Sequence, residues 1–358
     1  MKQLSIESEG RPVEVLQLIL SENGQELSLT GIFDEATDIA VRQFQQAQNL
    51  VVDGIVGNKT WAAIYEKAYS FKLKAKSDFL PDHDFIAEYF PKNCLYLHHT
   101  AGGARPDWTI AWWRNDNKDK DGNFRRRRVG TAFVIGREGL DGGTTFDGKI
   151  YRAFKEAHWA YHLGVNEGHT GHGADHNKQL NQQAIGIEIC SYGPLIHDED
   201  TGKFFYEWKT EAGIQRREIP EDQVCTLEQP WRGFTHFQKY TPKQIEACKE
   251  LILSLSYLFA IPLPERTYTP DWFEIDQDAK DGKPGIWTHA NVRPGKSDCF
   301  PQPELIDMLN SLHEAAKDFK LIPDDVGFES TETELPDFPV DMRAIQHYTV
   351  DLDDAEGE

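Results

Sequence analysis

The sequence predicts an α/β or α+β protein, with helices flanking a central mixed β-sheet and a small helical domain ahead of it. Three observations predict this. Hydrophobic residues make up 39% of the 358-residue chain and charged residues 27%, a mixture typical of a soluble globular protein. The length suits two domains of ordinary size. Short apolar strands alternate with helical patterns over residues 85–322, whereas residues 12–68 show helical patterns alone.

The composition divides the chain into five segments. They are an N-terminal extension (1–11), a helical domain (12–68), a lysine-rich and then turn-forming linker (69–84), a large mixed domain (85–322) and a C-terminal extension (323–358). The last segment holds twelve acidic residues and one basic residue, so it contributes −11 of the net charge of −21. Few apolar residues and many charges predict a flexible or peripheral tail there.

The charge and hydropathy patterns exclude several classes of protein. A net charge of −21 disfavours a general nucleic-acid binder. No apolar stretch approaches the roughly 20 residues of a membrane span, and the N-terminus lacks the apolar core of a signal peptide. We therefore expect a protein made in the cytoplasm, with no membrane span, whose export would need a dedicated route.

The helical domain is predicted from apolar spacing. Leu16 and Ile19 belong to a first helix that ends before the turn at Asn23, and a second helix fits residues 35–48. A glycine-punctuated turn at 52–57 precedes a short helix with Trp61.

This segment resembles the peptidoglycan-binding type 1 module of cell-wall hydrolases. The residues that carry the resemblance, in order, are Leu16-Gln17, TGIFDEAT (30–37), AVRQFQ (40–45) and NLVVDGIVGNKTW (49–61). The resemblance implies a three-helix wall-binding unit with Asp53, Gly54, Gly57 and Trp61 as wall-binding residues. Thr30 and Asp34 stand where the motif has Asp and Gly, which leaves the first turn open to a different construction. The alternative is a helical docking domain without affinity for the wall.

The large domain shows both kinds of element. Strands are expected at 93–99, 130–135 and 184–190. A long helix is expected at 241–259, with a Thr N-cap and Pro in the first helical position, and another at 302–317. The stretch from 196 to 233 interrupts the pattern as an insertion, to which the sequence assigns no role.

Residues with metal-binding chemistry occur at strand ends. The first strand ends in His98-His99, and His289 precedes a loop that leads to Asp298 and Cys299. Three ligands of this kind leave one tetrahedral position open, as in catalytic zinc sites. Glu188 interrupts an apolar strand, where a charged side chain needs a partner or a task, and it could accept a proton from a zinc-bound water. A lone strand-end histidine is more often structural.

The large domain resembles the type 2 N-acetylmuramoyl-L-alanine amidases, a family that includes phage lysozyme-type amidases and peptidoglycan recognition proteins. The motifs are LHHTAG (97–102), GTAFVI (130–135), AIGIE (184–188) and the stretch from Thr288-His289 to PGKSD (294–298).

The resemblance implies one Zn²⁺ held by His98, His289 and Asp298, with Cys299 as an alternative third ligand. It implies Glu188 as general base and Lys296 as the group that stabilises the oxyanion. The segment 158–164 borders the family's cleft. The substrate-binding residues so implied are His99, Thr131, Trp159 and His162. His99 is more simply an orienting neighbour of His98, and a packed aromatic loop is the alternative for 158–164.

The two resemblances predict a peptidoglycan hydrolase that cleaves the amide between N-acetylmuramic acid and L-alanine. The alternatives are a non-catalytic recognition protein and a zinc peptidase acting within the stem peptide. The missing signal peptide is typical of a phage endolysin, an effector exported by an injection apparatus or a cytoplasmic recycling enzyme, and an immunity or delivery partner stays open.

Overall fold

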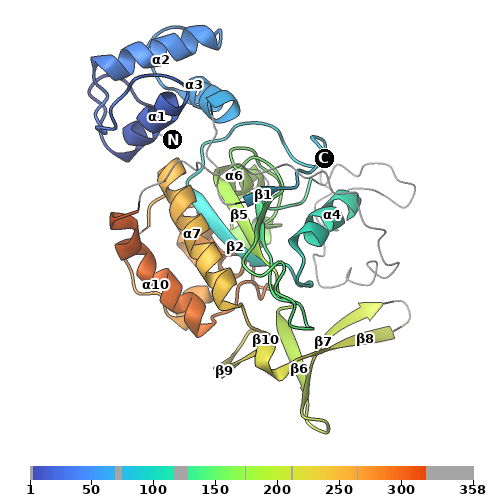
Figure 1. Ribbon diagram of the computed structural model, residues 1–358. Helices are drawn as coiled ribbons and strands as arrows, with labels where there is room; N and C mark the ends of the chain where they lie inside the picture. The colour runs from blue at the N-terminus through green and yellow to red at the C-terminus, as the bar shows by residue number, and fades with distance from the viewer. Residues whose placement is uncertain are drawn as a thin grey trace.

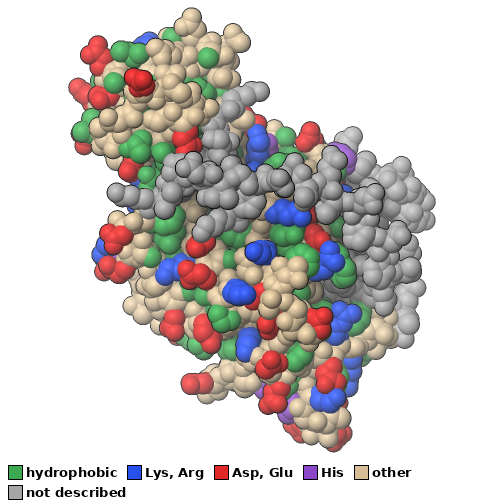
Figure 2. Space-filling model, in the orientation of Figure 1, with side chains coloured by type: hydrophobic (Ala, Val, Ile, Leu, Met, Phe, Trp, Pro, Cys, Tyr) green, Lys and Arg blue, Asp and Glu red, His purple; other side chains and the backbone are tan. Residues whose placement is uncertain are grey.

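The computed structural model describes residues 3–68, 75–116, 128–173, 175–210, 213–263 and 265–319, apart from the side chains of Lys67, Ala68 and Asp116. The predicted acidic tail at 323–358 lies outside the described residues. A helical lobe stands at one end of a larger α/β body (Figure 1). On the face seen in Figure 2, acidic and basic side chains are interspersed over the larger body.

The helical lobe contains three α-helices, as predicted. They are α1 (Arg11–Glu22), α2 (Glu35–Ala47) and α3 (Asn58–Ala63), and α3 continues into the π-helical turn η1 (Ile64–Ala68). Their buried sides meet in one apolar core, in which Ile19, Val41 and Trp61 are at most 1% exposed.

Two glutamines hold the two glycine turns of the lobe in the same way. Gln45 Oε1 accepts from the backbone N–H groups of Asp53 and Gly54 (3.1 and 2.9 Å), and its Nε2 lies 2.9 Å from Asp53 Oδ1. Gln17 repeats this pattern at the first turn. Its Oε1 accepts from the N–H of Thr30 at 2.9 Å, and its Nε2 lies 3.0 Å from Thr30 Oγ1. The Thr30 hydroxyl thus replaces the Asp53 carboxylate, so the first turn keeps the same construction.

The large domain is built on a six-stranded mixed sheet, which confirms the predicted fold class. The strand order is β1 (Ala75–Ser77), β4 (Ile150–Arg152), β3 (Phe133–Ile135), β5 (Ala184–Ile189), β2 (Cys94–His99) and β11 (Gly285–Thr288). All neighbouring pairs are parallel except β3 with β4. The three expected strands correspond to β2, β3 and β5.

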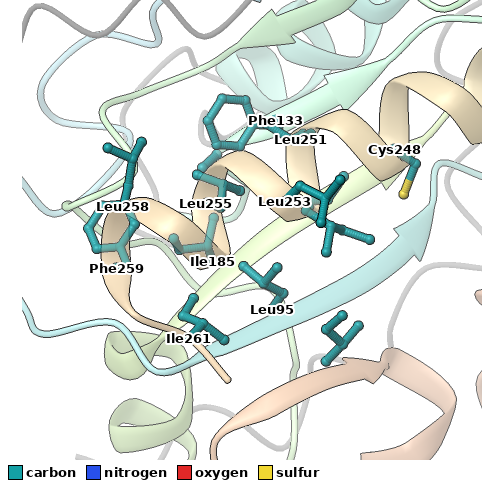
Figure 3. Packing of buried hydrophobic residues seen from close by; sticks show 14 of the residues in the cluster. Leu95, Phe133, Ile185, Cys248, Leu251, Leu253, Leu255, Leu258, Phe259 and Ile261 are labelled. Carbon is teal, nitrogen blue, oxygen red and sulfur yellow. The ribbon is translucent and has the colours of Figure 1, made fainter. Parts of the chain in front are cut away.

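Helices cover both faces of this sheet. The long helix α7 (Pro242–Phe259) starts with a capping box between Thr241 and Gln244, and Figure 3 shows its Leu251 and Leu255 over Leu95 of β2 and Ile185 of β5. Helix α10 (Pro303–Lys317) packs beside it. On the other face, Tyr96 of β2 packs with a second apolar cluster that includes Leu180.

The remaining helices of the large domain are shorter. They are α4 (Pro106–Asp116), α5 (Glu167–Thr170), α6 (Asp175–Gln183), α8 (Gln277–Lys280), α9 (His289–Val292) and the 3₁₀ turns η2 (Glu221–Gln223) and η3 (Pro270–Phe273). No helix among the described residues has the length and apolarity to cross a membrane.

Part of the expected linker at 69–84 belongs to the domain. Strand β1 pairs with β4 at the sheet edge, and Leu80 and Asp84 are buried. Backbone pairing at an edge leaves little trace in a three-residue side-chain pattern, so the sequence did not indicate this strand.

The insertion forms most of a second sheet. Its antiparallel strands follow the order β8 (Gly213–Ile219), β7 (Lys203–Thr210), β6 (Pro194–Asp198), β10 (Phe234–Gln238) and β9 (Val224–Trp231). This sheet lies at the end of the large domain opposite the helical lobe (Figure 1).

The helical lobe packs directly on the large domain. The Tyr65 hydroxyl donates to the carbonyl of Leu258 at 2.8 Å, and its ring stacks on Phe259 with centroids 4.9 Å apart. Glu66 forms an ion pair with Lys155 at 3.1 Å and a second one with His158. Apolar, hydrogen-bonded and charged contacts therefore join the two parts.

Candidate metal centre and active site

The candidate ligands meet at one edge of the main sheet. His98 lies near the end of β2, and His289 is the first residue of α9, directly after β11. Glu188 lies opposite His98 on the neighbouring strand β5. Because β2, β5 and β11 are parallel, their carboxyl ends share an edge, and Asp298 reaches the same place from the loop after α9.

Three ligand atoms form a compact triangle. His98 Nδ1 lies 3.1 Å from His289 Nδ1 and 3.2 Å from Asp298 Oδ2, and His289 Nδ1 lies 3.0 Å from the same oxygen. All three residues are buried. Ligands bound at roughly 2.0–2.1 Å around a tetrahedral zinc lie about 3.3 Å apart. Within the described part of the chain, this is the one cluster of three such residues whose atoms converge in this way.

The outer nitrogens of both imidazoles have partners of their own. His289 Nε2 lies 2.8 Å from the carbonyl of Leu163, to which it can only donate. Its Nδ1 lone pair is therefore left to face the triangle. His98 Nε2 lies 2.9 Å from His162 Nδ1. Such contacts orient ligating histidines and fix their tautomer, so the donor set fits a divalent metal ion.

The protonation states suit this arrangement. Burial lowers the pKa of His289 to about 4, although Asp298 opposes that shift. Burial also acts to raise the pKa of Asp298, but the two histidines and Lys296 outweigh it and hold that pKa well below its usual value. Neutral imidazole beside ionised carboxylate is the form that binds a metal.

Glu188 and Lys296 both interact electrostatically with Asp298 of the triangle. Burial, reinforced by the charge of Asp298, raises the pKa of Glu188 well above its usual value, whereas Lys296 opposes the shift. Glu188 Oε2 has no hydrogen-bond partner within the described chain. Burial lowers the pKa of Lys296, and Asp298 counteracts this. A carboxylate with a raised pKa and a free oxygen can accept a proton near neutral pH.

A glycine makes room for His162. Gly186 lies two residues before Glu188 on β5 and so faces the same side of the sheet. A Cβ there would lie 2.6 Å from Thr131 Cγ2 and 3.1 Å from His162 Nδ1. His162 approaches His98 across this gap. Thr131 is 1% exposed and donates its hydroxyl to the carbonyl of Phe133, so its expected substrate contact stays a prediction.

The structure separates Cys299 and His99 from the triangle. The Cys299 thiol hydrogen-bonds with the Tyr240 hydroxyl, and His99 Nδ1 lies 3.0 Å from that same hydroxyl. His99 faces the side of the sheet opposite to His98, since successive strand residues alternate. The geometry thus favours Asp298 over Cys299 as third ligand, and it separates His99 from the cleft side where a substrate contact was expected.

Two expected contact residues are in the interior instead. Trp159 is 3% exposed and packs edge-on against Tyr161, which agrees with the alternative of a packed aromatic loop. Trp61 is fully buried in the lobe, where it fills the core, and its expected contact with the wall stays a prediction. The aromatic pattern indicated large apolar side chains without showing which way they face.

The other expected wall-binding residues also have internal roles. Asp53 Oδ1 accepts from the N–H of Ile55 at 2.9 Å. Gly54 has φ +72°, and a Cβ there would lie 2.1 Å from Asp38 Oδ1. Gly57 is the N-cap of α3. These residues build the turn, and wall contacts made by them stay a prediction.

One supporting residue had no clear signal in the sequence. The buried Asn181 of α6 accepts through Oδ1 from the N–H groups of His162 and Leu163 at 2.8 and 3.2 Å. It thereby fixes the two groups that orient His98 and His289. A polar residue on the buried side of a helix was the available hint.

Fold and site together define a mixed α/β domain with a candidate metal centre at the carboxyl edge of its sheet. The model of a family described as N-acetylmuramoyl-L-alanine amidase matches residues 89–302, and that of a peptidoglycan binding domain matches residues 9–64. Since the first match covers more than half of the chain, the chain belongs to the N-acetylmuramoyl-L-alanine amidase family. Searches among curated proteins and solved structures gave no match.

Proposed function

We propose that the protein is a zinc-dependent peptidoglycan hydrolase that cleaves the amide between N-acetylmuramic acid and L-alanine. The observation that carries the proposal is the triangle of His98, His289 and Asp298, with ligand atoms 3.0–3.2 Å apart and both outer imidazole nitrogens engaged. The family matches support an amide as the scissile bond and peptidoglycan as the substrate.

Each residue of the candidate site has a separate role in the proposed reaction. His98, His289 and Asp298 would hold zinc, which acts as a Lewis acid on the water and on the scissile carbonyl. Glu188 takes the proton of the attacking water at its free Oε2 and delivers it to the departing amine of L-alanine. The Lys296 ammonium stabilises the negative charge that develops on the carbonyl oxygen.

The helical lobe supports this activity by attachment. A peptidoglycan-binding domain beside the amidase domain raises the local concentration of substrate. Cleavage of this bond on an intact wall is bacteriolytic, and we place the working site at the cell wall, reached by phage-type lysis or dedicated export.

Mass spectrometry of digested sacculi tests the proposal. Zinc-loaded protein should release stem peptides with a free L-alanine amine, and Glu188→Gln should release none above background. Glu221→Gln, at an exposed glutamate of η2, is the matched control and should behave as the parent protein. Binding without release would support a recognition protein, and cuts within the stem peptide would support a peptidase.

A further inference from the structure

The inserted sheet reaches the candidate active site through one arginine. Trp231 pairs with Phe234 across the β9–β10 hairpin, so Arg232 and Gly233 form its two-residue turn. Their φ angles are +52° and +82°. Turns of this kind favour Asn-Gly, because both central residues need positive φ. An arginine in the first position is strained, so the turn itself does not account for the choice of residue.

The Arg232 side chain contacts the segment after β11. Its guanidinium donates to the carbonyl of Pro294 and, at 3.3 Å, to that of Ala290. It also forms an ion pair with Glu274 at 3.1 Å, and its side chain is 16% exposed. One planar group thus joins two backbone carbonyls that are four residues apart.

These carbonyls belong to the segment that carries the site. Ala290 follows His289 directly, and its N–H donates to the carbonyl of Asp298 at 3.0 Å. Pro294 lies in a turn closed by the N–H of Lys296, which donates to the carbonyl of Arg293 at 3.2 Å. Arg232 therefore binds the backbone between His289 and Asp298, at positions six and two residues before Lys296.

Lys296 depends on this backbone for its position. None of the hydrogen bonds and ion pairs found among the described residues involves the Lys296 ammonium, whose charge interacts with those of Asp298 and Glu188. The adjoining residue Gly295 has no atom within 4 Å of the place where a Cβ would stand. No packing at Gly295 therefore helps to fix the turn.

We propose that Arg232 is a positioning residue, which sets the turn that presents Lys296 and Asp298 to the site. The proposal rests on the proposed function for the task of these two residues, but the contacts of Arg232 are independent of it. It assigns a role in the amidase site to the inserted sheet. The forked guanidinium suits two carbonyls and one carboxylate, whereas a lysine ammonium would hold fewer of them.

The variants Arg232→Ala and Arg232→Lys test the proposal. The matched control is Arg216→Ala, which removes an arginine of the same sheet whose ion pairs, with Glu207 and Asp198, and whose ring contact, with Phe205, all lie within that sheet. Three quantities are measured on the full chain: amide hydrogen exchange by mass spectrometry, zinc affinity by competition with a chelator, and kcat and KM on a soluble muropeptide.

Arg232→Ala should speed exchange in peptides covering 289–298, with exchange in β2 and β5 unchanged. Loss of such a supporting contact typically costs about 10–100-fold in metal affinity or activity. We expect that loss in kcat or zinc affinity, with KM within about twofold. Arg232→Lys should be intermediate, and Arg216→Ala should match the parent protein in all three measurements.

Two results would overturn the proposal. One is parental exchange over 289–298 together with parental kcat and zinc affinity in Arg232→Ala. The other is faster exchange throughout the domain, which would show a role in general stability. If Arg232→Ala does not fold, Arg232→Lys and Glu274→Gln decide by the same measurements. A parent protein that cleaves no muropeptide would refute the proposed function, while exchange and zinc affinity would still judge Arg232.

Discussion

Substitution of Gly186 by alanine should displace His162, which is the partner of the candidate ligand His98. The new Cβ would lie 2.6 and 2.9 Å from Cγ2 and Cβ of Thr131, and 3.1 Å from His162 Nδ1. Thr131 is buried and β-branched, so it has little freedom to rotate away. Overpacking of this kind lowers the free energy of unfolding by about 1–3 kcal/mol. Replacing glycine by alanine also reduces the conformational entropy of the unfolded chain, which offsets about 0.4–1 kcal/mol of that loss.

The same substitution should weaken zinc binding. Displacement of His162 removes the partner of His98 Nε2, and loss of such a partner typically costs about 10–100-fold in metal affinity. We therefore expect a net destabilisation of about 1–2 kcal/mol in the metal-free protein, and a larger one with zinc present.

Urea unfolding with and without zinc, together with chelator competition, measures both effects. Gly173→Ala is the control, since Gly173 is exposed and has no atom within 4 Å of its Cβ position. Parental stability and zinc affinity in Gly186→Ala would refute the reasoning, because the contact between β5 and His162 would then have room for a methyl group.

Four further predictions follow from individual residues. Glu188→Gln should lower kcat on a muropeptide by about 10²–10⁴-fold with zinc affinity kept within a few-fold, and an unchanged kcat would rule out its role as base. Chelation should lower the melting temperature and added zinc restore it, because a metal bound by the folded state alone stabilises that state; calorimetry showing no change would contradict a bound ion. Burial lowers the pKa of Lys92 to about 7, so the folded protein holds fewer protons than the unfolded one above that pH, and stability should rise from pH 7 to 9. Lys92→Met should flatten this slope in urea unfolding, and a slope equal to the parent's would exclude Lys92 as its source. Gln45→Ala should destabilise the helical lobe by about 1–3 kcal/mol, because it leaves the buried N–H of Gly54 and the part-buried N–H of Asp53 without their acceptor, and a parental thermal transition would show that these bonds are dispensable.

The three candidate ligands could be predicted because their signal is local. His98 lies near the end of an apolar strand, and His289 follows another, so parallel pairing brings the two together at one sheet edge. A charged residue such as Glu188 within an apolar strand marks the same edge. These features can be recognised from the type of each residue and its neighbours in the sequence.

The supporting residues could not be predicted in this way. Asn181 and Arg232 act on backbone groups far away in the sequence, and Tyr240 links His99 to Cys299 through one hydroxyl. Backbone acceptors occur at every residue, so no pattern of side chains indicates which of them an asparagine or arginine will bind. Their partners emerge only when the tertiary fold sets the distances.

The motif of the helical lobe shows that recognising a domain does not reveal the role of each motif residue. Asp53, Gly54 and Trp61 were expected at the wall, yet they cap a turn, permit a positive φ and fill the core. Such residues recur in a motif because the turn geometry requires them. A motif can therefore identify a binding domain by residues that build its turns and core, while the residues that contact the ligand stay a prediction.

The packing of the lobe on the amidase domain changes how attachment to the wall can be tested. Removal of residues 1–70 would expose Phe259 and leave the carbonyl of Leu258 without the Tyr65 hydroxyl, so the truncated protein would lose stability as well as its lobe. Loss of activity on soluble and intact substrate alike would then say nothing about attachment. Val51 is 75% exposed and lies outside this interface, so a polar substitution there leaves the packing of the two domains intact. If such a variant acts more weakly on sacculi but cleaves a soluble muropeptide at the parental rate, the difference measures the contribution of wall binding.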